Sequence, residues 1–223
     1  MKYIFFLIIL IITGACMDQE QKLNEGLHEY TRDIQAEFDN IPGERKEQLK
    51  ELADYIADND SVNLTFICTH NSRRSHMAQL WAQAAAHHYG INAECYSGGT
   101  EATAFNPRAV KAMKKAGFII NEKKSGDNPV YEVIYSSKAP AVDAFSKKYE
   151  HEANPSENFA AVMVCSHADE NCPFVPGAKD RFSIPYDDPK DFDGTEQEEA
   201  KYDERCRDIA REMYFVMKEA RGQ

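Results

Sequence analysis

Blocks of apolar and amphipathic residues alternate along the chain from Val62 onward. The apolar run 64–67 predicts a strand, and the longer run 75–89 that follows it predicts a helix. The same order returns in the strand-like run 93–97 and the helix-like run near 107–116. Strands that alternate with helices are typical of a parallel sheet with helices on both faces, and we expect a single sheet of this kind.

Two further elements complete this part of the chain. The run 160–165 predicts a buried strand, and the run 196–220 predicts a long C-terminal helix. The polar stretch 121–158 between them is rich in Lys and Tyr and has no clear period. The sequence therefore leaves that stretch without an assigned structure.

The region before Val62 has a different pattern. Apolar residues recur at helical spacing on both sides of a break at Pro42 and Gly43, which predicts two helices. The region carries no chemical motif. We expect a helical extension, residues 16–60, that packs on a main domain, residues 61–223, and the alternative is a separate binding module.

The first residues are typical of an export signal. Lys2 precedes the apolar run 3–12, and small residues lead from there to Cys16. The run is shorter than the roughly 20 apolar residues of a membrane-spanning helix. The end of the segment resembles a bacterial lipobox, which implies removal of residues 1–15, acylation of Cys16, and a lipoprotein on the periplasmic or cell-surface side of a membrane. An ordinary signal peptide and an uncleaved anchor are the alternatives, and both also export the protein.

The net charge of the chain limits the classes of partner that it can bind. The 223 residues carry a net charge of −11. This argues against nucleic acid as a partner, because nucleic-acid-binding surfaces are usually basic. An anionic substrate remains compatible with the sequence, since the field at a binding loop matters more than the total charge.

The chemistry is concentrated in the loop between the first strand and its helix. The strand ends at Cys68, and the loop residues are Thr69, His70, Asn71, Ser72, Arg73 and Arg74. A loop that leads into a helix N-terminus binds anions through backbone N–H groups, and the same field favours a cysteine thiolate. Arg74 can hold a tetrahedral oxyanion through two N–H bonds. The pattern predicts attack by Cys68 on phosphate or arsenate, and the alternative is a structural cysteine at a strand end.

A second pair of cysteines lies near the later strand. Cys165 ends the predicted strand, and Cys172 lies in the loop that follows. Two cysteines this near on a loop can form a disulfide. Zinc is the competing interpretation, but the C-x6-C spacing is unusual for zinc and His167 alone is insufficient. We therefore expect no metal.

A pair of carboxylates follows, at Asp187 and Asp188 before Pro189. A carboxyl group on such a turn can serve as general acid toward a leaving oxygen. The alternative is a solvated acidic turn.

These segments together resemble the low-molecular-weight protein tyrosine phosphatase family, and most closely its thioredoxin-coupled arsenate reductases. The family loop C-x-G-N-x-x-R-S corresponds here to C-T-H-N-S-R-R-S, and Y-S-G-G-T and N-P-R-A match later family segments. The resemblance implies that Cys68 is the nucleophile, Arg74 the oxyanion clamp and Ser75 the thiolate stabiliser. It also implies that Asn71 holds the loop shape and that Asp188 is the general acid.

The cysteine pair distinguishes the branches of the family. Cys165 and Cys172 match the redox pair of the reductases, which plain phosphatases lack. The resemblance implies no required cofactor and an external dithiol, such as a thioredoxin-like protein, as reductant. A phosphatase acting through Cys68, Arg74 and Asp188 on phosphotyrosine or another phosphate ester is the alternative. A non-catalytic oxyanion-binding lipoprotein is the second alternative.

The chain also departs from the family pattern. His70 replaces a glycine, so we expect a strained or reshaped backbone there. Arg73 replaces a second cysteine of many members and adds positive charge near the thiolate. Gln79 replaces a glutamate of the potassium site found in the reductase branch, which agrees with no metal. Cys95 and Cys206 are expected to be structural.

Overall fold

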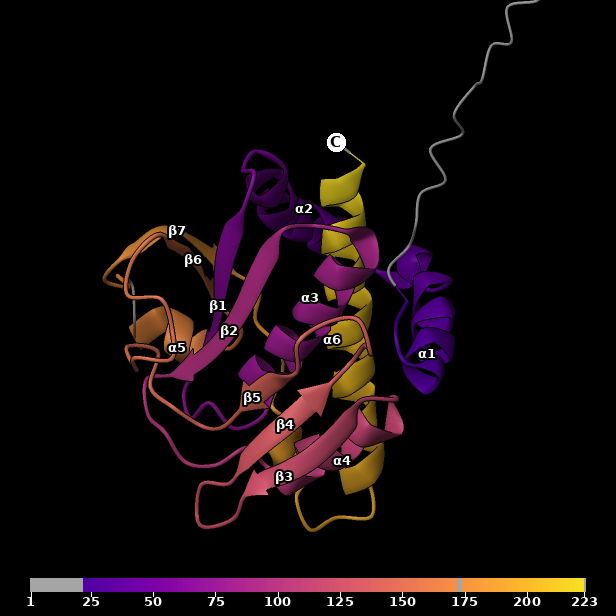
Figure 1. The fold of residues 1–223 in the computed structure, drawn as a ribbon, viewed down its shortest axis with the longest axis vertical. Helices are drawn as coiled ribbons and strands as arrows, with labels where there is room; N and C mark the ends of the chain where they lie inside the picture. The colour runs from indigo at the N-terminus through magenta and orange to yellow at the C-terminus, as the bar shows by residue number, and fades with distance from the viewer. Residues whose placement is uncertain (1–21, 172–173, 223) are drawn as a thin grey trace, which may run out of the picture.

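A parallel sheet forms the centre of the molecule. The computed structural model describes residues 22–171 and 174–222. The sheet has the order β2-β1-β6-β7, from β1 (Val62–Cys68), β2 (Ala93–Gly99), β6 (Phe159–Met163) and β7 (Ala178–Ser183) (Figure 1). Strand β6 is buried along its whole length, and β1 is buried at all but one residue. Both faces of these central strands are therefore covered, as expected for a parallel sheet.

Helices flank this sheet, and the predicted parallel α/β fold is confirmed. Helix α3 (Arg74–Tyr89) packs on β1 and β2, and α6 (Glu198–Arg221) packs on α3. The shorter helices are α4 (Pro107–Lys115) and α5 (Ser166–Asn171). The elements predicted from the apolar pattern all correspond to observed elements, with ends that differ by a few residues.

The N-terminal extension is helical, as predicted. It comprises α1 (Glu25–Gln35), the 3₁₀ turn η1 (Phe38–Asn40) and α2 (Gly43–Ala57). Helices α1 and α2 both pack against α6. Their apolar residues Leu27, Ile34, Leu49 and Leu52 are fully buried in the same hydrophobic core as the sheet. The extension is thus an integral layer of the fold.

A second, antiparallel sheet, which the sequence did not predict, lies in the stretch without an assigned structure. Strands β3 (Ile119–Lys124), β4 (Val130–Ile134) and β5 (Val142–Ala144) form an antiparallel sheet in the order β3-β4-β5. It lies below the carboxyl end of the parallel sheet in the view of Figure 1. Five of the six residues of β3 are exposed, so no apolar alternation marks the strand in the sequence.

The part of the chain that the structure describes holds no helix long and apolar enough to cross a membrane. The predicted signal segment 1–15 and Cys16 lie outside the described residues, and so does Cys172.

The shared core predicts the stability of an α2 variant. Leu49→Ala should lower the free energy of unfolding by about 2–5 kcal/mol, because it leaves a cavity between α2 and the rest of the core. Urea unfolding followed by circular dichroism should still give one cooperative transition. Glu47→Ala, at an exposed position of the same helix, is the matched control and should change stability by less than about 0.5 kcal/mol. A separate early transition for the N-terminal helices would contradict the shared core.

Candidate active site

The loop between β1 and α3 turns sharply at Asn71. This residue is fully buried and has a φ of 43°, in the left-handed region that asparagine tolerates better than most residues. Its side-chain Nδ2 donates to Ser75 Oγ at 2.9 Å, and its Oδ1 accepts from the backbone N–H of Lys147 at 2.9 Å. Asn71 is therefore fixed from both sides, and it joins the loop to the segment that follows the second sheet.

Cys68 lies at the end of this hydrogen-bond chain. The side chain is buried, and its Sγ is 3.1 Å from Ser75 Oγ. Because Ser75 Oγ already accepts a bond from Asn71, its own hydrogen is free to point toward the sulfur. The chain from Lys147 N–H through Asn71 to Ser75 thus places a hydroxyl that can donate to the Cys68 sulfur.

The loop carbonyls are bound by neighbouring segments. Thr69 O accepts from the backbone N–H of Glu101 at 2.8 Å, and Ser72 O accepts from that of Asn106 at 2.9 Å. His70 O accepts from Ser146 Oγ at 3.0 Å. In a trans peptide the N–H points opposite to the carbonyl. The N–H groups of the following residues therefore point away from these neighbours, as required for an anion-binding loop.

Gly99 at the end of β2 allows this close approach. A Cβ atom there would lie 2.2 Å from Glu101 O and 2.7 Å from both Asn71 N and Thr69 O. No side chain fits at such distances from backbone atoms. The second glycine of the Y-S-G-G-T segment is thus required by the loop that it touches.

The expected strain at His70 does not occur. Among the described residues, only Asn71, Asn158 and certain glycines have a positive φ. His70 adopts an ordinary backbone conformation, so the glycine of the family pattern is not needed here. Its ring Nε2 lies 3.5 Å from Glu101 Oε2, at the rim of the loop.

Asp188 is held by both arginines of the loop. Arg73 Nε donates to Oδ1 at 2.8 Å, and Arg74 Nη2 donates to Oδ2 at 2.8 Å. Burial alone would raise the pKa of Asp188, but the charges of Arg74 and Arg73 outweigh it and hold the pKa below its ordinary value. The structure thus brings the predicted acid to the loop, and in this arrangement the acid is a carboxylate.

Asp187 is in a different environment. Its side chain is 98% exposed and lies 3.5 Å from Arg205. The two adjacent carboxylates are therefore separated by structure, and only Asp188 contacts the loop.

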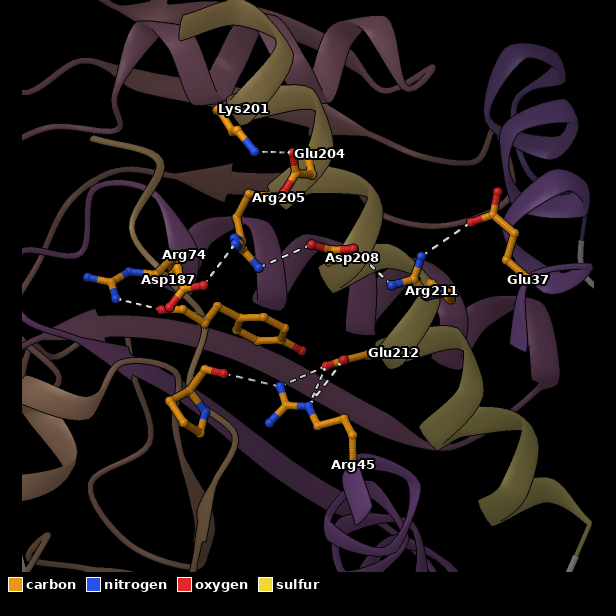
Figure 2. A network of polar contacts seen from close by, with 12 residues as sticks. Glu37, Arg45, Arg74, Asp187, Lys201, Glu204, Arg205, Asp208, Arg211 and Glu212 are labelled. Atoms are coloured by element: carbon orange, nitrogen blue, oxygen red, sulfur yellow. Dashed lines mark hydrogen bonds and ion pairs between the residues drawn. The ribbon is translucent and has the colours of Figure 1, made fainter. Parts of the chain in front are cut away.

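The turn that carries Asp188 is braced from several elements (Figure 2). Arg74 Nη1 donates to Tyr186 O at 2.8 Å, and Arg45 of α2 donates to Pro185 O at 3.2 Å. Arg45 also forms an ion pair with the buried Glu212 of α6, at 2.8 Å. Two arginines from different helices thus bind the backbone just before Asp188.

Cys165 lies next to the loop. It follows β6, and the bond from Val164 N–H to Ile67 O at 2.9 Å continues the pairing of β6 with β1 up to this point. Its side chain is 1% exposed, and its Sγ is 3.6 Å from Thr69 Oγ1. The structure therefore brings Cys165 against the residue that follows Cys68, whereas Cys172 lies outside the described residues.

Cys95 and Cys206 occupy the core. Both are buried, and burial raises the pKa of both thiols, that of Cys206 to about 12. Cys206 also accepts a bond from Trp81 Nε1 at 3.4 Å. Thiols in such surroundings are unreactive, as a structural role requires.

Two residues that contact the site were not predicted from the sequence. Lys147 is 5% exposed, and burial lowers its pKa to about 8. It lies in the polar stretch that had no period, so no pattern pointed to it. His167 Nδ1 lies 3.3 Å from Thr69 Oγ1, although His167 stood out in the sequence only as an insufficient zinc ligand. Within residues 22–171 and 174–222, no group of three or more His, Cys, Asp or Glu side chains could hold a metal ion.

The chain is similar to several known proteins. The family model of the low molecular weight phosphotyrosine protein phosphatases matches residues 63–133. An arsenate reductase of Bacillus licheniformis is 34% identical over 143 residues, which are 64% of this chain and 85% of the relative. An arsenate reductase of Halalkalibacterium halodurans is 36% identical over the same length and with the same coverage. The structure of a low molecular weight protein tyrosine phosphatase from T. tengcongensis covers 71% of this chain and 99% of that chain, with 19% identity and a TM-score of 0.48.

The different environments of the two carboxylates predict different effects on rate. Asp188→Asn should lower the rate toward substrates with poor leaving groups by about 10²–10⁴-fold, because the proton donor is lost. Asp187→Asn is the matched control and should change the rate by less than about twofold, since its side chain is exposed. Steady-state hydrolysis of aryl phosphates with graded leaving groups measures both. Equal losses in the two variants would contradict the assignment of Asp188.

Proposed function

Because the chain belongs to the low-molecular-weight protein tyrosine phosphatase family, together with arsenate reductases that it matches at 34–36% identity, we propose that it reduces arsenate through Cys68, Cys165 and Cys172. The chain is an enzyme with a cysteine-based oxyanion site, of the arsenate reductase or the phosphatase kind. One observation carries the finer proposal. A second buried thiol, Cys165, contacts the residue after Cys68, and phosphate ester hydrolysis needs no such thiol.

The first step uses the loop. The thiolate of Cys68 attacks the arsenic of arsenate, which the loop N–H groups and Arg74 bind. A sulfur–arsenic bond forms, and an arsenic–oxygen bond breaks. Asp188 supplies the proton that allows the oxygen to leave as water.

Substrate binding itself would prepare the acid. In the structure Arg74 binds the Asp188 carboxylate, so an incoming oxyanion competes with this carboxylate for the arginine. Asp188 would then lose one positive partner and gain a negative neighbour, and both changes raise its pKa. Arg73 would keep Asp188 in place meanwhile. Asp188 would thus hold a proton when the oxyanion is bound.

The later steps move two electrons to arsenic. Cys165 attacks Cys68, a disulfide forms, and the sulfur–arsenic bond breaks with its electron pair on arsenic, which leaves as arsenite. Cys172 then attacks Cys165, which releases Cys68 as a thiolate and leaves a disulfide between Cys165 and Cys172. An external dithiol, such as a thioredoxin-like protein, reduces that disulfide.

The location of the protein is a separate proposal, based on its first residues. The apolar run 3–12 and the small residues before Cys16 support export and a lipid anchor at Cys16. The periplasm is oxidising. An exported reductant must therefore supply the electrons.

A phosphatase is the second candidate. The matching family model describes phosphatases, and Cys68, Arg74 and Asp188 are together sufficient for hydrolysis of a phosphate ester. Water would then resolve a phosphocysteine, and the second thiol would have no part in turnover.

Two cysteine variants distinguish the candidates. In a reductase, Cys165→Ser should abolish multiple turnover of arsenate with a thioredoxin system, because no thiol attacks the arseno-cysteine. Cys172→Ser should complete one turnover and then stop with Cys68 and Cys165 joined. Peptide mapping after one turnover identifies the bond, and arsenite is measured directly.

Ser166→Ala, which changes an exposed neighbour of Cys165, is the control and should keep full arsenate reduction. Hydrolysis of an aryl phosphate should survive both cysteine substitutions. If the unchanged protein yields neither arsenite nor a disulfide among the three cysteines, the phosphatase replaces the reductase as the proposed function.

The lipid anchor has its own test. Mass spectrometry of protein from the native membrane should find a diacylated or triacylated N-terminus at Cys16. Cys16→Ser should remain unlipidated and should leave the membrane fraction. A soluble protein that begins at Met1 would contradict the anchor.

A further inference from the structure

The second thiol contacts a hydroxyl, and that hydroxyl contacts an imidazole. Cys165 Sγ is 3.6 Å from Thr69 Oγ1, and Thr69 Oγ1 is 3.3 Å from Nδ1 of His167. Thr69 belongs to the anion-binding loop, whereas His167 lies on α5, two residues after Cys165. The three side chains therefore form a continuous contact from the thiol to the imidazole.

The proton positions of this contact follow from the groups involved. A threonine hydroxyl can accept one hydrogen bond and donate another at the same time. Thr69 can therefore accept from the Cys165 thiol and donate to His167 Nδ1, when the imidazole carries its proton on Nε2. All hydrogens then point from the sulfur toward the imidazole.

The Cys165 thiol needs a path by which its proton can leave. Only the thiolate of Cys165 can attack another sulfur. The side chain is 1% exposed, so bulk water does not reach the thiol to take its proton. His167 is exposed, which allows it to pass a proton on to solvent.

We infer that His167 accepts the proton of Cys165 through the Thr69 hydroxyl when Cys165 attacks Cys68. The proton of Cys165 moves to Thr69 Oγ1 while the proton of Thr69 moves to His167 Nδ1. The sulfur–sulfur bond forms, and the group on Cys68 leaves with the electron pair of its bond to sulfur. This inference rests on the proposed reductase, since only that function needs Cys165 to attack.

The elements next to the histidine carry other ionisable groups. Helix α5 also carries Asp169 and Glu170, and Asp169 is bound to Arg181 of β7. The loop carries His70, which faces Glu101. Strands β1 and β6, on which α5 packs, contribute only Cys68. A pH dependence must therefore be assigned to His167 by substitution.

The experiment uses an oxidant in place of arsenate. The Cys172→Ser protein is mixed with diamide at concentrations where the rate no longer rises. Diamide adds across its N=N bond to the Cys68 thiolate, and Cys165 then displaces the hydrazine, which leaves with the electron pair and takes up a proton. The disulfide between Cys68 and Cys165 is quantified by quenching and peptide mapping from pH 5 to pH 9.

The expected result is a rate of disulfide formation that rises with pH in one step. His167→Asn should remove the step and slow the reaction about 10²-fold at pH 7.5. Added imidazole should restore the rate in His167→Ala, which loss of a merely structural contact would not allow. Thr69→Val should be slow like His167→Asn, whereas Thr69→Ser should react at nearly the normal rate.

His28→Asn, which removes an exposed histidine on α1, is the control and should leave rate and pH step unchanged. Suppose that the Cys172→Ser protein forms the disulfide, and that adding His167→Asn changes neither the rate nor the pH step. This result would overturn the inference about His167 but not the proposed cysteine relay. Failure of imidazole to restore His167→Ala would also overturn it. A parent protein that forms no disulfide between Cys68 and Cys165 would overturn both the inference and the proposed cysteine relay.

Discussion

The site depends on the ion pairs that join Arg73 and Arg74 to Asp188. Two adjacent guanidinium groups with 9% and 13% exposed side chains would repel each other without a shared counter-charge. Asp188 supplies that charge, and in doing so ties the turn of the acid to the anion-binding loop. Under the proposed function, the same pairing would make the loop responsive to substrate, because an oxyanion would offer Arg74 a second negative partner. Asp188 would then take up a proton only after Arg74 has moved to the oxyanion.

The N-terminal helical region also supports the turn that carries Asp188. Arg45 of α2 holds Pro185 O and pairs with Glu212, while a second line of contacts leads from Asp187 through Arg205, Asp208 and Arg211 to Glu37 (Figure 2). Both lines begin within three residues of Asp188. The extension carries no chemical motif, yet it packs in the same core and braces the backbone on which the acid stands. Its position is thus a constraint on the site as well as on stability.

The features that could be predicted from the sequence are those that follow a regular pattern of apolar residues or a local motif. The strands β1 and β6 are apolar runs, and the helices have apolar residues at helical spacing. The order of these elements, the parallel sheet and the loop at Cys68 could therefore be predicted from the sequence. The strand β3 was missed because nearly all of its residues face solvent. The ion pairs of Asp188 with two arginines were not predicted, because Arg73 and Asp188 are 115 residues apart. No local sequence pattern indicates such a pairing. Lys147 was missed for both reasons, since it lies in that polar stretch and reaches Asn71 across 76 residues.

The two thiols of the proposed relay face opposite chemical demands, and their surroundings differ accordingly. Cys68 must be a thiolate before substrate arrives, and the chain from Lys147 N–H through Asn71 and Ser75 directs hydrogens toward its sulfur. Cys165 must keep its proton until Cys68 carries a leaving group, and its neighbour Thr69 can carry that proton away toward His167. Two adjacent thiolates would repel each other and disfavour oxyanion binding. The Ser75 hydroxyl at the first sulfur and the proton path from the second, whose sulfur also accepts from the Ala168 N–H at 3.4 Å, would therefore set the order in which the cysteines react.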